Sequence, residues 1–372
     1  MQTIDPIQAN TSLSANIQPE LMAVLKDIAD NVEIRSDFSI HHPLYKPLEI
    51  PVEAVERFQQ MPAQIKQKFL SLQLRSFLYG IYYNGSMRNA LALDTDTQSF
   101  QLDLENNSIM GIDTAFFVRL HDANSGRGYF DSDWTVIKQA DEDTLVVRKG
   151  GLRLYVQREK YLIQADRQAQ TGDTIAIKMP KNRMQSGFYM AVADNGFLHA
   201  SAANILVRIY FNLTPDGSVA VMKSLTRMLN EISLPFSFKV LYNPQDYNRF
   251  DSGVLYFDRQ DYDVVIRVLG DLWSEHQTYF KSEIPLFTKK LATGMGVAEE
   301  PDLKFAERES FGMNRCQIIA NGLLEAFEQE EKSADRSMAA ILSQFAAVGI
   351  DLECPHLNSN SQDVYRVVNS EQ

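Results

Sequence analysis

Cysteine is scarce in this chain, and its two cysteines stand apart from any recognisable motif. Among 372 residues only Cys316 and Cys354 occur, and neither belongs to a CxxC motif or a Cys/His cluster. The sequence therefore predicts neither a disulfide framework nor a cysteine-ligated zinc site. We expect two ordinary reduced cysteines.

Targeting signals and long apolar runs are also lacking. The first residues, MQTIDPIQANTSLSANIQPE, have no basic start and no apolar core of signal-peptide type, and no later run reaches membrane-spanning length. We therefore expect a cytoplasmic protein without membrane contact.

Common catalytic motifs are missing as well. The chain has no GxxxxGK[ST], no GxGxxG entering a helix, no HExxH and no GxSxG, so nucleotide, zinc-protease and common hydrolase activities lose their usual support. Its six histidines are dispersed: His41 and His42 fall in an expected loop, and the others stand alone. Each is explained by a structural or solvent-facing role, but His199 is kept as a candidate proton donor.

Positive charge is in deficit overall but gathers in the middle of the chain. The formal net charge is -12, which argues against broad nucleic-acid binding. Residues 174–259 nevertheless hold nine Lys or Arg against six Asp or Glu. Such a region favours a small anion pocket. A solvated sheet face with scattered ion pairs explains the same composition.

The pattern of elements predicts an α+β fold with a mainly antiparallel sheet, packed helices and a helical N-terminal part. Helical spacing begins at Pro19 and returns over 52–83, where Pro62 is expected to start a new helix. From about Gly111 the pattern turns to strands, including a hairpin at Gly150-Gly151. Further strands are expected at 174–179, 187–193, 205–212, 235–242 and 253–257, with helices at 218–232, 262–280, 312–329 and 337–348.

This organisation predicts four segments. They are a flexible leader over 1–18, a helical region over 19–110, an α+β domain over 111–358 and a flexible tail over 359–372.

Alternation along three expected strands sets cations on polar faces. Lys178, Arg208 and Lys239 each stand opposite wholly apolar faces, and Tyr210 shares the face of Arg208. Other cations follow in loops or at a helix start: Lys181 and Arg183 in AIKMPKNRMQSGFYM, Arg249 in YNPQDYNRFDSGVLYF, and Arg315 in the expected first turn of a helix, where an anion finds unpaired N–H groups.

The order of these motifs resembles the HopA-type family of type III effectors and their bacterial relatives. The resemblance rests on IKMPKNRMQSGFYMAVAD, ILVRIYFNLTPDG, YNPQDYNRFDSGVLYF, PLFTKKLATGMGVAEEP, SFGMNR and GIDLECPHLN, and covers roughly 111–358. It implies an α+β fold. For members that accompany kinase-like partners in class V lanthipeptide and thioamide peptide biosynthesis, it implies a lyase that removes phosphate from phosphoserine or phosphothreonine in a precursor peptide. We expect this biosynthetic branch.

Charge and strand alternation assign candidate roles for that chemistry. Lys178 is the expected base, and Tyr210 or His199 the expected acid. Phosphate would be bound by cations, without a metal or cofactor; the expected set is Lys181, Arg183, Arg208, Lys239, Arg249 and Arg315. The expected partners are a phosphorylated precursor peptide and a kinase-like protein. A module that binds a phosphopeptide or a partner without chemistry is the alternative.

Overall fold

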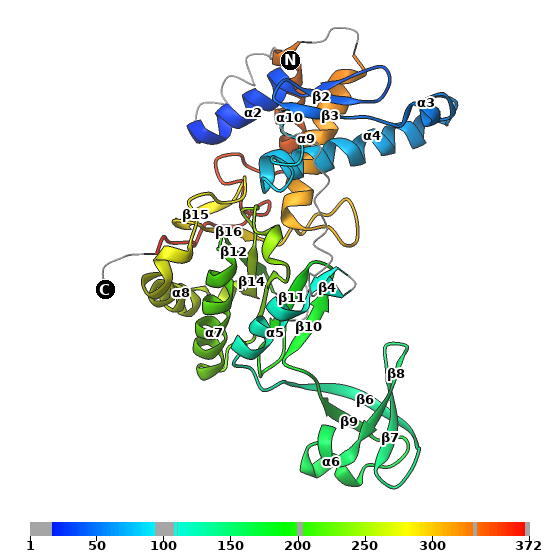
Figure 1. Cartoon of the computed structure of the whole chain (residues 1–372), viewed down its shortest axis with the longest axis vertical. Coiled ribbons are helices and arrows are strands. Elements are labelled where there is room, and N and C mark those ends of the chain that lie inside the picture. The colour runs from blue at the N-terminus through cyan, green and yellow to red at the C-terminus, as the bar shows by residue number, and fades with distance from the viewer. Residues whose placement is uncertain (1–16, 94–107, 110, 199–203, 330–332, 369–372) are drawn as a thin grey trace, which may run out of the picture.

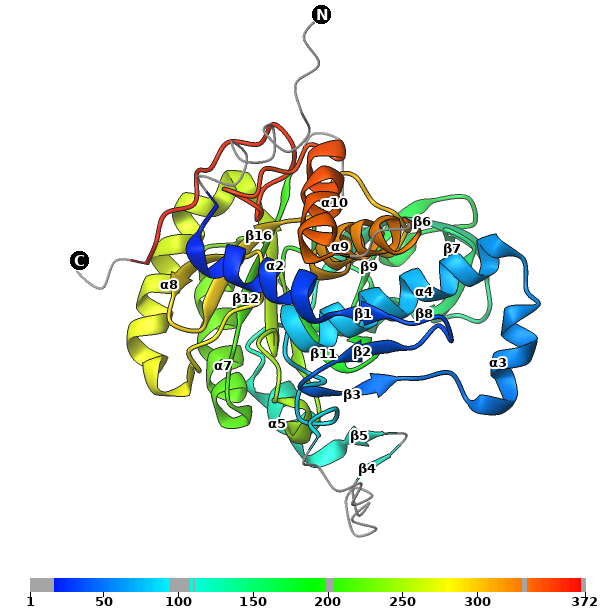
Figure 2. The same cartoon turned by 90° about the horizontal axis from the view of Figure 1, so that it is seen from above.

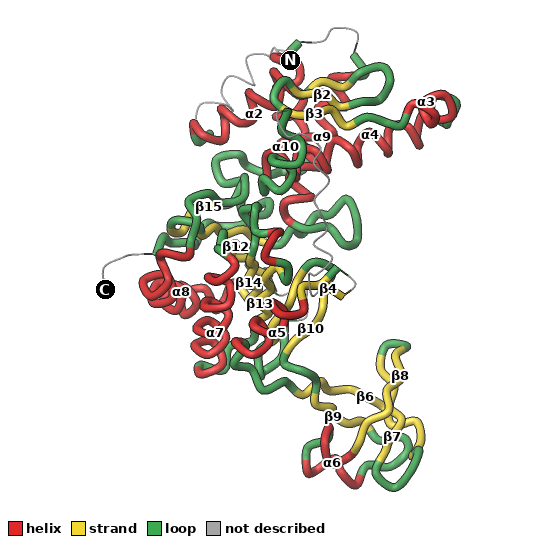
Figure 3. The backbone as a smooth tube through the Cα atoms, in the orientation of Figure 1, coloured by secondary structure: helices red, strands yellow, loops and turns green. Residues whose placement is uncertain are grey.

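The structure is a computed structural model that describes residues 17–93, 108–109, 111–198, 204–329 and 333–368. Helices and antiparallel sheets are mixed along the chain, which confirms the α+β class (Figure 1, Figure 3). Residues 1–16 of the expected leader and the expected boundary at residue 110 lie outside the described residues.

A seven-stranded antiparallel sheet forms the centre of the molecule. Its strand order is β10-β11-β13-β14-β12-β16-β15. Four of the expected strands are confirmed here as β11, β12, β13 and β14, and the alternation in β11 and β13 matches a sheet that buries one face more completely than the other. The bounds are β10 (Asn182–Gln185), β11 (Phe188–Val192), β12 (Leu206–Phe211), β13 (Ser237–Leu241), β14 (Gly253–Asp258), β15 (Lys289–Ala292) and β16 (Met295–Glu299).

One face of this sheet is covered by three helices, α5 (Thr114–Ala123), α7 (Pro215–Glu231) and α8 (Tyr262–His276) (Figure 1). Ile209, Phe238 and Leu255 of the sheet pack there with Leu225 and Leu269 of the helices. Helix α5 corrects the expectation of strands from residue 111. Asp113 caps it by accepting a hydrogen bond from the Phe116 N–H, and this cap favours a helix.

The opposite face is partly covered by a helical region built from both ends of the chain (Figure 2). Pro62 precedes α4, as the sequence predicted, and α4 continues into a π-helical turn, η1. The helices are α2 (Pro19–Asn31), α3 (Val52–Gln59), α4 (Ala63–Leu78), η1 (Tyr79–Tyr83), α9 (Phe311–Phe327) and α10 (Ala334–Ala347).

This helical region also contains a three-stranded sheet that the sequence did not predict, formed by β1 (Glu33–Ile34), β2 (Ile40–His42) and β3 (Tyr45–Leu48). The expected loop at His41 and His42 is therefore wrong, because both residues lie on β2. The His42 imidazole is buried and shares a hydrogen bond with the Tyr82 hydroxyl at 2.9 Å, which fixes this strand against η1.

Residues 130–178, here named the arm, extend from the central sheet at the end of the molecule opposite the helical region (Figure 1). The arm is a four-stranded antiparallel sheet of order β8-β7-β6-β9 with a short helix, and it has its own core around Trp134, Val147 and Ile175. The Gly150-Gly151 hairpin is confirmed between β7 and β8. The bounds are β6 (Phe130–Gln139), β7 (Thr144–Lys149), β8 (Leu152–Gln157), α6 (Arg158–Tyr161) and β9 (Thr174–Lys178).

The segment from Pro355 to residue 368 runs across the central sheet without regular structure and is held by many hydrogen bonds. Buried Glu299 accepts from the Asn358 N–H, the Ser361 hydroxyl and the Tyr365 hydroxyl. Tyr262 donates to the Arg366 carbonyl. The sequence predicted a flexible tail from 359; residues 359–368 have these contacts, and 369–372 lie outside the described residues.

Candidate functional site

The strand registers bring several of the predicted cations onto one face of the central sheet, here named the cation face. Arg183 on β10 lies opposite Met190 on β11, which lies opposite Lys239 on β13. Tyr256 on β14 lies opposite Arg208 on β12 and opposite Ser237, two residues from Lys239. Because alternate residues of a strand share a face, Arg183, Lys239, Tyr256 and Arg208 all project from the same side.

Lys239 lies at the open part of this face. Its Nζ is 4.4 Å from the centroid of the Phe188 ring and 5.5 Å from that of the Tyr256 ring, and it donates to Gln185 Oε1 at 3.3 Å. Arg183, which is exposed, stacks its guanidinium 4.8 Å from the Phe197 ring centroid. Lys239 is half-buried and Arg183 exposed, so a solute can reach both cations in the part of the chain that the structure describes.

Arg249 borders the open part from the loop before β14. Its guanidinium forms a two-point ion pair with Asp251 and lies 5.7 Å from the Phe188 ring centroid. Asp251 also accepts from the Tyr79 hydroxyl of η1 at 3.2 Å. Burial raises the pKa of Asp251, but the Arg249 guanidinium, the Asn84 side chain and the charge of Lys239 lower it, and the net pKa lies below the ordinary value.

Arg208 is nearly buried and paired. Its Nε and Nη2 both contact Glu300 Oε2, and Glu300 accepts a second ion pair from Lys304 at 2.6 Å. The guanidinium carbon lies 5.0 Å from the Tyr256 ring centroid. Arg208 therefore lies on the cation face with its charge neutralised by Glu300, and Tyr256 lies between it and Lys239.

Tyr210, a candidate acid, lies beneath the helical region. Its hydroxyl is buried and, like that of Tyr83, has no hydrogen-bond partner among the described residues. Burial raises the pKa of both phenols. An unpaired hydroxyl beside Arg208 is unusual, since buried polar atoms are normally hydrogen-bonded.

Lys178 and Lys181 lie away from the cation face. Lys178, the predicted base, is the last residue of β9 and lies opposite Phe130 in the arm sheet, not in the sheet of Arg208 and Lys239. Which strands pair depends on packing between residues that are far apart in the sequence, and the spacing of residues within one strand does not predict it. Lys181 donates its Nζ to the Asn124 carbonyl at 2.8 Å. His199 lies outside the described residues.

Arg315 is buried in the second turn of α9 rather than in its first, which corrects the predicted position. The helix begins at Phe311, and Ser310 caps it. Arg315 donates to the carbonyls of Pro355 and Leu357 and to Asn314 Oδ1. Burial lowers the pKa of Arg315 to about 10. In this structure its guanidinium fastens the segment after Pro355 to α9.

A protein-family model matches part of this chain. Residues 179–357 match the HopA1 effector protein family. The predicted resemblance is thereby confirmed for these residues, which include the central sheet, α7 to α9 and every residue of the cation face.

Solved structures give a weaker similarity. One is an effector protein from Pseudomonas syringae pv. tomato strain DC3000, with 17% identity and a TM-score of 0.40 over 66% of this chain and 81% of the other. Another, from Pseudomonas syringae pv. syringae strain 61, has 16% identity and a TM-score of 0.42 over 79% and 98%. No curated protein matches.

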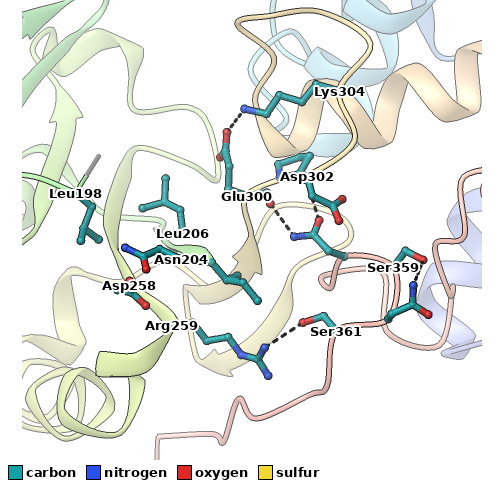
Figure 4. Close-up of a pocket in the computed structure, with 14 residues that line it drawn as sticks. Leu198, Asn204, Leu206, Asp258, Arg259, Glu300, Asp302, Lys304, Ser359 and Ser361 are labelled. Atoms are coloured by element: carbon teal, nitrogen blue, oxygen red, sulfur yellow. Dashed lines mark hydrogen bonds and ion pairs between the residues drawn. The ribbon is translucent and has the colours of Figure 1, made fainter. Parts of the chain in front are cut away.

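A pocket of about 510 Å³ lies beside the cation face of the HopA1-family region (Figure 4). Leu206 and Asp258, which face each other across β12 and β14, form one wall. Glu300 and Lys304 form another, and Arg259 with Asn358 closes it. Acidic and basic groups are mixed here, so the pocket complements a polar side chain better than a bare phosphate.

Sequence reasoning missed Glu300 as a partner and Tyr256 as the link between Arg208 and Lys239. The acid pair Glu299-Glu300 directly after an apolar strand was the available signal. Among the described residues, no cluster of His, Cys, Asp or Glu has the make-up of a metal site. No helix in the same part of the chain has the length and apolarity to cross a bilayer.

Proposed function

We propose that the cation face binds a phosphoserine or phosphothreonine side chain of a peptide and eliminates its phosphate. The observation that supports this proposal is the placement of half-buried Lys239 and exposed Arg183 on one sheet face, bordered by Arg249. Phosphate oxygens accept several charge-assisted hydrogen bonds at once, and guanidinium forks suit that geometry. The mixed pocket beside Arg208 would take a neighbouring side chain of the peptide.

The reaction requires a base, a leaving-group clamp and an acid. Neutral Lys239 Nζ would remove the α-proton, the C–H electron pair would form the Cα=Cβ double bond, and the Cβ–O bond would break to release inorganic phosphate. Arg183 and Arg249 would stabilise the charge that grows on the phosphate. The Tyr256 hydroxyl, on the same face between Lys239 and Arg208, would protonate the bridging oxygen.

This assignment moves the base from Lys178 to Lys239, because only Lys239 lies among the other cations. Tyr256 replaces Tyr210 for a similar reason, since Tyr210 is 3% exposed. The kinase-like partner remains part of the proposal, as the protein that would supply the phosphorylated peptide.

One observation favours binding without chemistry. The two aromatic rings beside Lys239 Nζ stabilise its ammonium form by cation–π attraction, whereas a base must be neutral. Under this second function the same face would hold the phosphopeptide and leave it intact.

The test is mass spectrometry of a phosphoserine and a phosphothreonine peptide incubated with the full chain. We expect loss of phosphoric acid, reduced roughly 10²- to 10⁴-fold by Lys239→Ala. Lys178→Ala is the matched control and keeps its activity. Peptide retained intact, with binding weakened by Lys239→Ala, would establish the binding module instead. If the peptide is neither converted nor bound, both functions are excluded.

A further inference from the structure

The outer face of the arm sheet carries cations that have no acidic partner among the residues the structure describes. Arg148 on β7 lies directly opposite Arg153 on β8. Two residues before Arg148, Val146 lies between Lys138 on β6 and Tyr155 on β8. The side chains of Lys138, Arg148, Arg153 and Tyr155 are all exposed, that of Tyr155 by 69%. None of the three cations forms an ion pair with any residue that the structure describes.

The opposition of Arg148 and Arg153 is unfavourable in the isolated chain. Like charges directly across a strand pair destabilise a sheet. The hydrogen bond from the Arg158 N–H to the Asp143 carbonyl, 2.8 Å long, marks a bonded residue pair. Because bonded and non-bonded pairs alternate, Arg148 and Arg153 form a non-bonded pair, whose side chains lie closest together. Two cations thus lie directly across from each other on neighbouring strands.

The same alternation determines what the edge of the sheet offers. Strand β8 is an outer strand in the order β8-β7-β6-β9. In a non-bonded pair the backbone N–H and C=O groups turn away from the neighbouring strand. Arg153 and Tyr155 therefore direct their backbone donors and acceptors to the open edge, where a further strand can pair with them.

We propose that β8 binds an extended acidic peptide segment as an additional antiparallel or parallel strand. Backbone hydrogen bonds to Arg153 and Tyr155 would hold it, and a carboxylate of the peptide would lie against the forks of Arg153 and Arg148. On the other side, Leu152 is 54% exposed and offers apolar contact. The partner sequence is thus one in which acidic and apolar residues alternate.

A peptide fits these observations better than a nucleic acid. The edge groups recur at every second residue, which is the repeat of a β-strand and not of a phosphate backbone. The overall charge of -12 repels a long polyanion while leaving a short acidic segment tolerated. The inference is independent of the proposed lyase, because the arm lies outside the family-matched residues 179–357.

The test is fluorescence anisotropy of a labelled synthetic peptide of alternating glutamate and valine, titrated with the full chain. We expect saturable binding, weakened about tenfold to a hundredfold by Arg153→Glu. Lys160→Glu, an exposed cation of α6 in the same arm, is the matched charge control. A peptide with lysine in place of glutamate is expected not to bind.

A second pair of variants separates edge pairing from charge alone. Tyr155→Pro removes an outward N–H without taking a ladder hydrogen bond, and is expected to abolish binding. Tyr155→Ser keeps the N–H and retains more affinity. Circular dichroism confirms that each variant is folded. Absent binding, unchanged affinity in Arg153→Glu or Tyr155→Pro, or preferential binding of a single-stranded RNA to this face would overturn the proposal.

Discussion

The central sheet and the arm both carry cations on a sheet face, but the cations differ in whether they have acidic partners. In the central sheet Arg208 and Arg249 have acidic partners, Glu300 and Asp251, and both ion pairs are largely shielded from solvent. In the arm Arg148 and Arg153 face each other without an acid. Burial explains the difference, because a buried charge without a partner costs far more free energy than an exposed one.

Acidic partners and burial together determine which cations are available to a ligand. Arg208 and Arg249 are already neutralised by Glu300 and Asp251. The half-buried Lys239 and the exposed Arg183, Arg148 and Arg153 have no acidic partner among the described residues. A sequence count of cations does not distinguish the two groups.

The largest expected effect comes from the most buried cation. Arg315→Met leaves the carbonyls of Pro355 and Leu357 without their donor, so we expect the free energy of unfolding to fall by roughly 3–5 kcal/mol. Guanidinium chloride unfolding followed by circular dichroism measures it. Arg308→Met, at an exposed site, should change it by less than about 0.5 kcal/mol. If Arg315→Met and Arg308→Met lower the free energy of unfolding equally, Arg315 contributes no more to stability than a surface arginine.

A smaller effect is expected at Asp251. Asp251→Asn leaves the mostly buried Arg249 guanidinium without its counter-ion, and we expect a loss of roughly 3 kcal/mol at pH 7. The native pKa of Asp251 is depressed below 3.8, so its stabilisation is complete above the unfolded pKa and disappears as the pH falls through the native pKa.

Unfolding measured at neutral and acidic pH tests this sign. The difference between wild type and Asp251→Asn should shrink at low pH, with exposed Asp246→Asn as the control. A difference that grows on acidification contradicts the assigned ion pair.

The smallest expected effect has the opposite sign and lies in the arm. Arg153→Glu converts a like-charge pair into an opposite-charge pair, so the free energy of unfolding should rise by about 0.2–1 kcal/mol. A double-mutant cycle with Arg148→Glu isolates the pair from other effects. If the two substitutions simply add, the arginines do not interact and the contrast with the central sheet is lost.

The sequence predicted most individual elements of the fold. Strands β11 to β14 and helices α7 to α10 lie close to their expected bounds, because alternation and helical spacing are local properties. The partner of β9 could not be predicted in this way, since pairing with β6 depends on packing in the arm core. Strands β1 to β3 escaped notice because two to four residues are too few to display a period.

The candidate site was predicted less completely than the fold. Alternation placed Lys178, Arg208 and Lys239 each on the polar face of its own strand, and the registers put Arg208 and Lys239 on one face of the central sheet and Lys178 in the arm sheet. It could not reveal that Glu300, 92 residues from Arg208 in sequence, neutralises that arginine. Ion pairs between distant segments depend on the folded backbone, and one sequence holds no record of them.

Glu299 gives folding a temporal order. This carboxylate is fully buried, and three of its donors lie 59 to 66 residues later in the chain. During synthesis β16 therefore leaves the ribosome well before the groups that satisfy Glu299. Until they arrive, docking β16 against β12 would bury a carboxylate that has the Arg259 guanidinium 3.8 Å away but lacks these three hydrogen-bond donors. We therefore expect the central sheet to close only after the segment that follows Pro355 has been made.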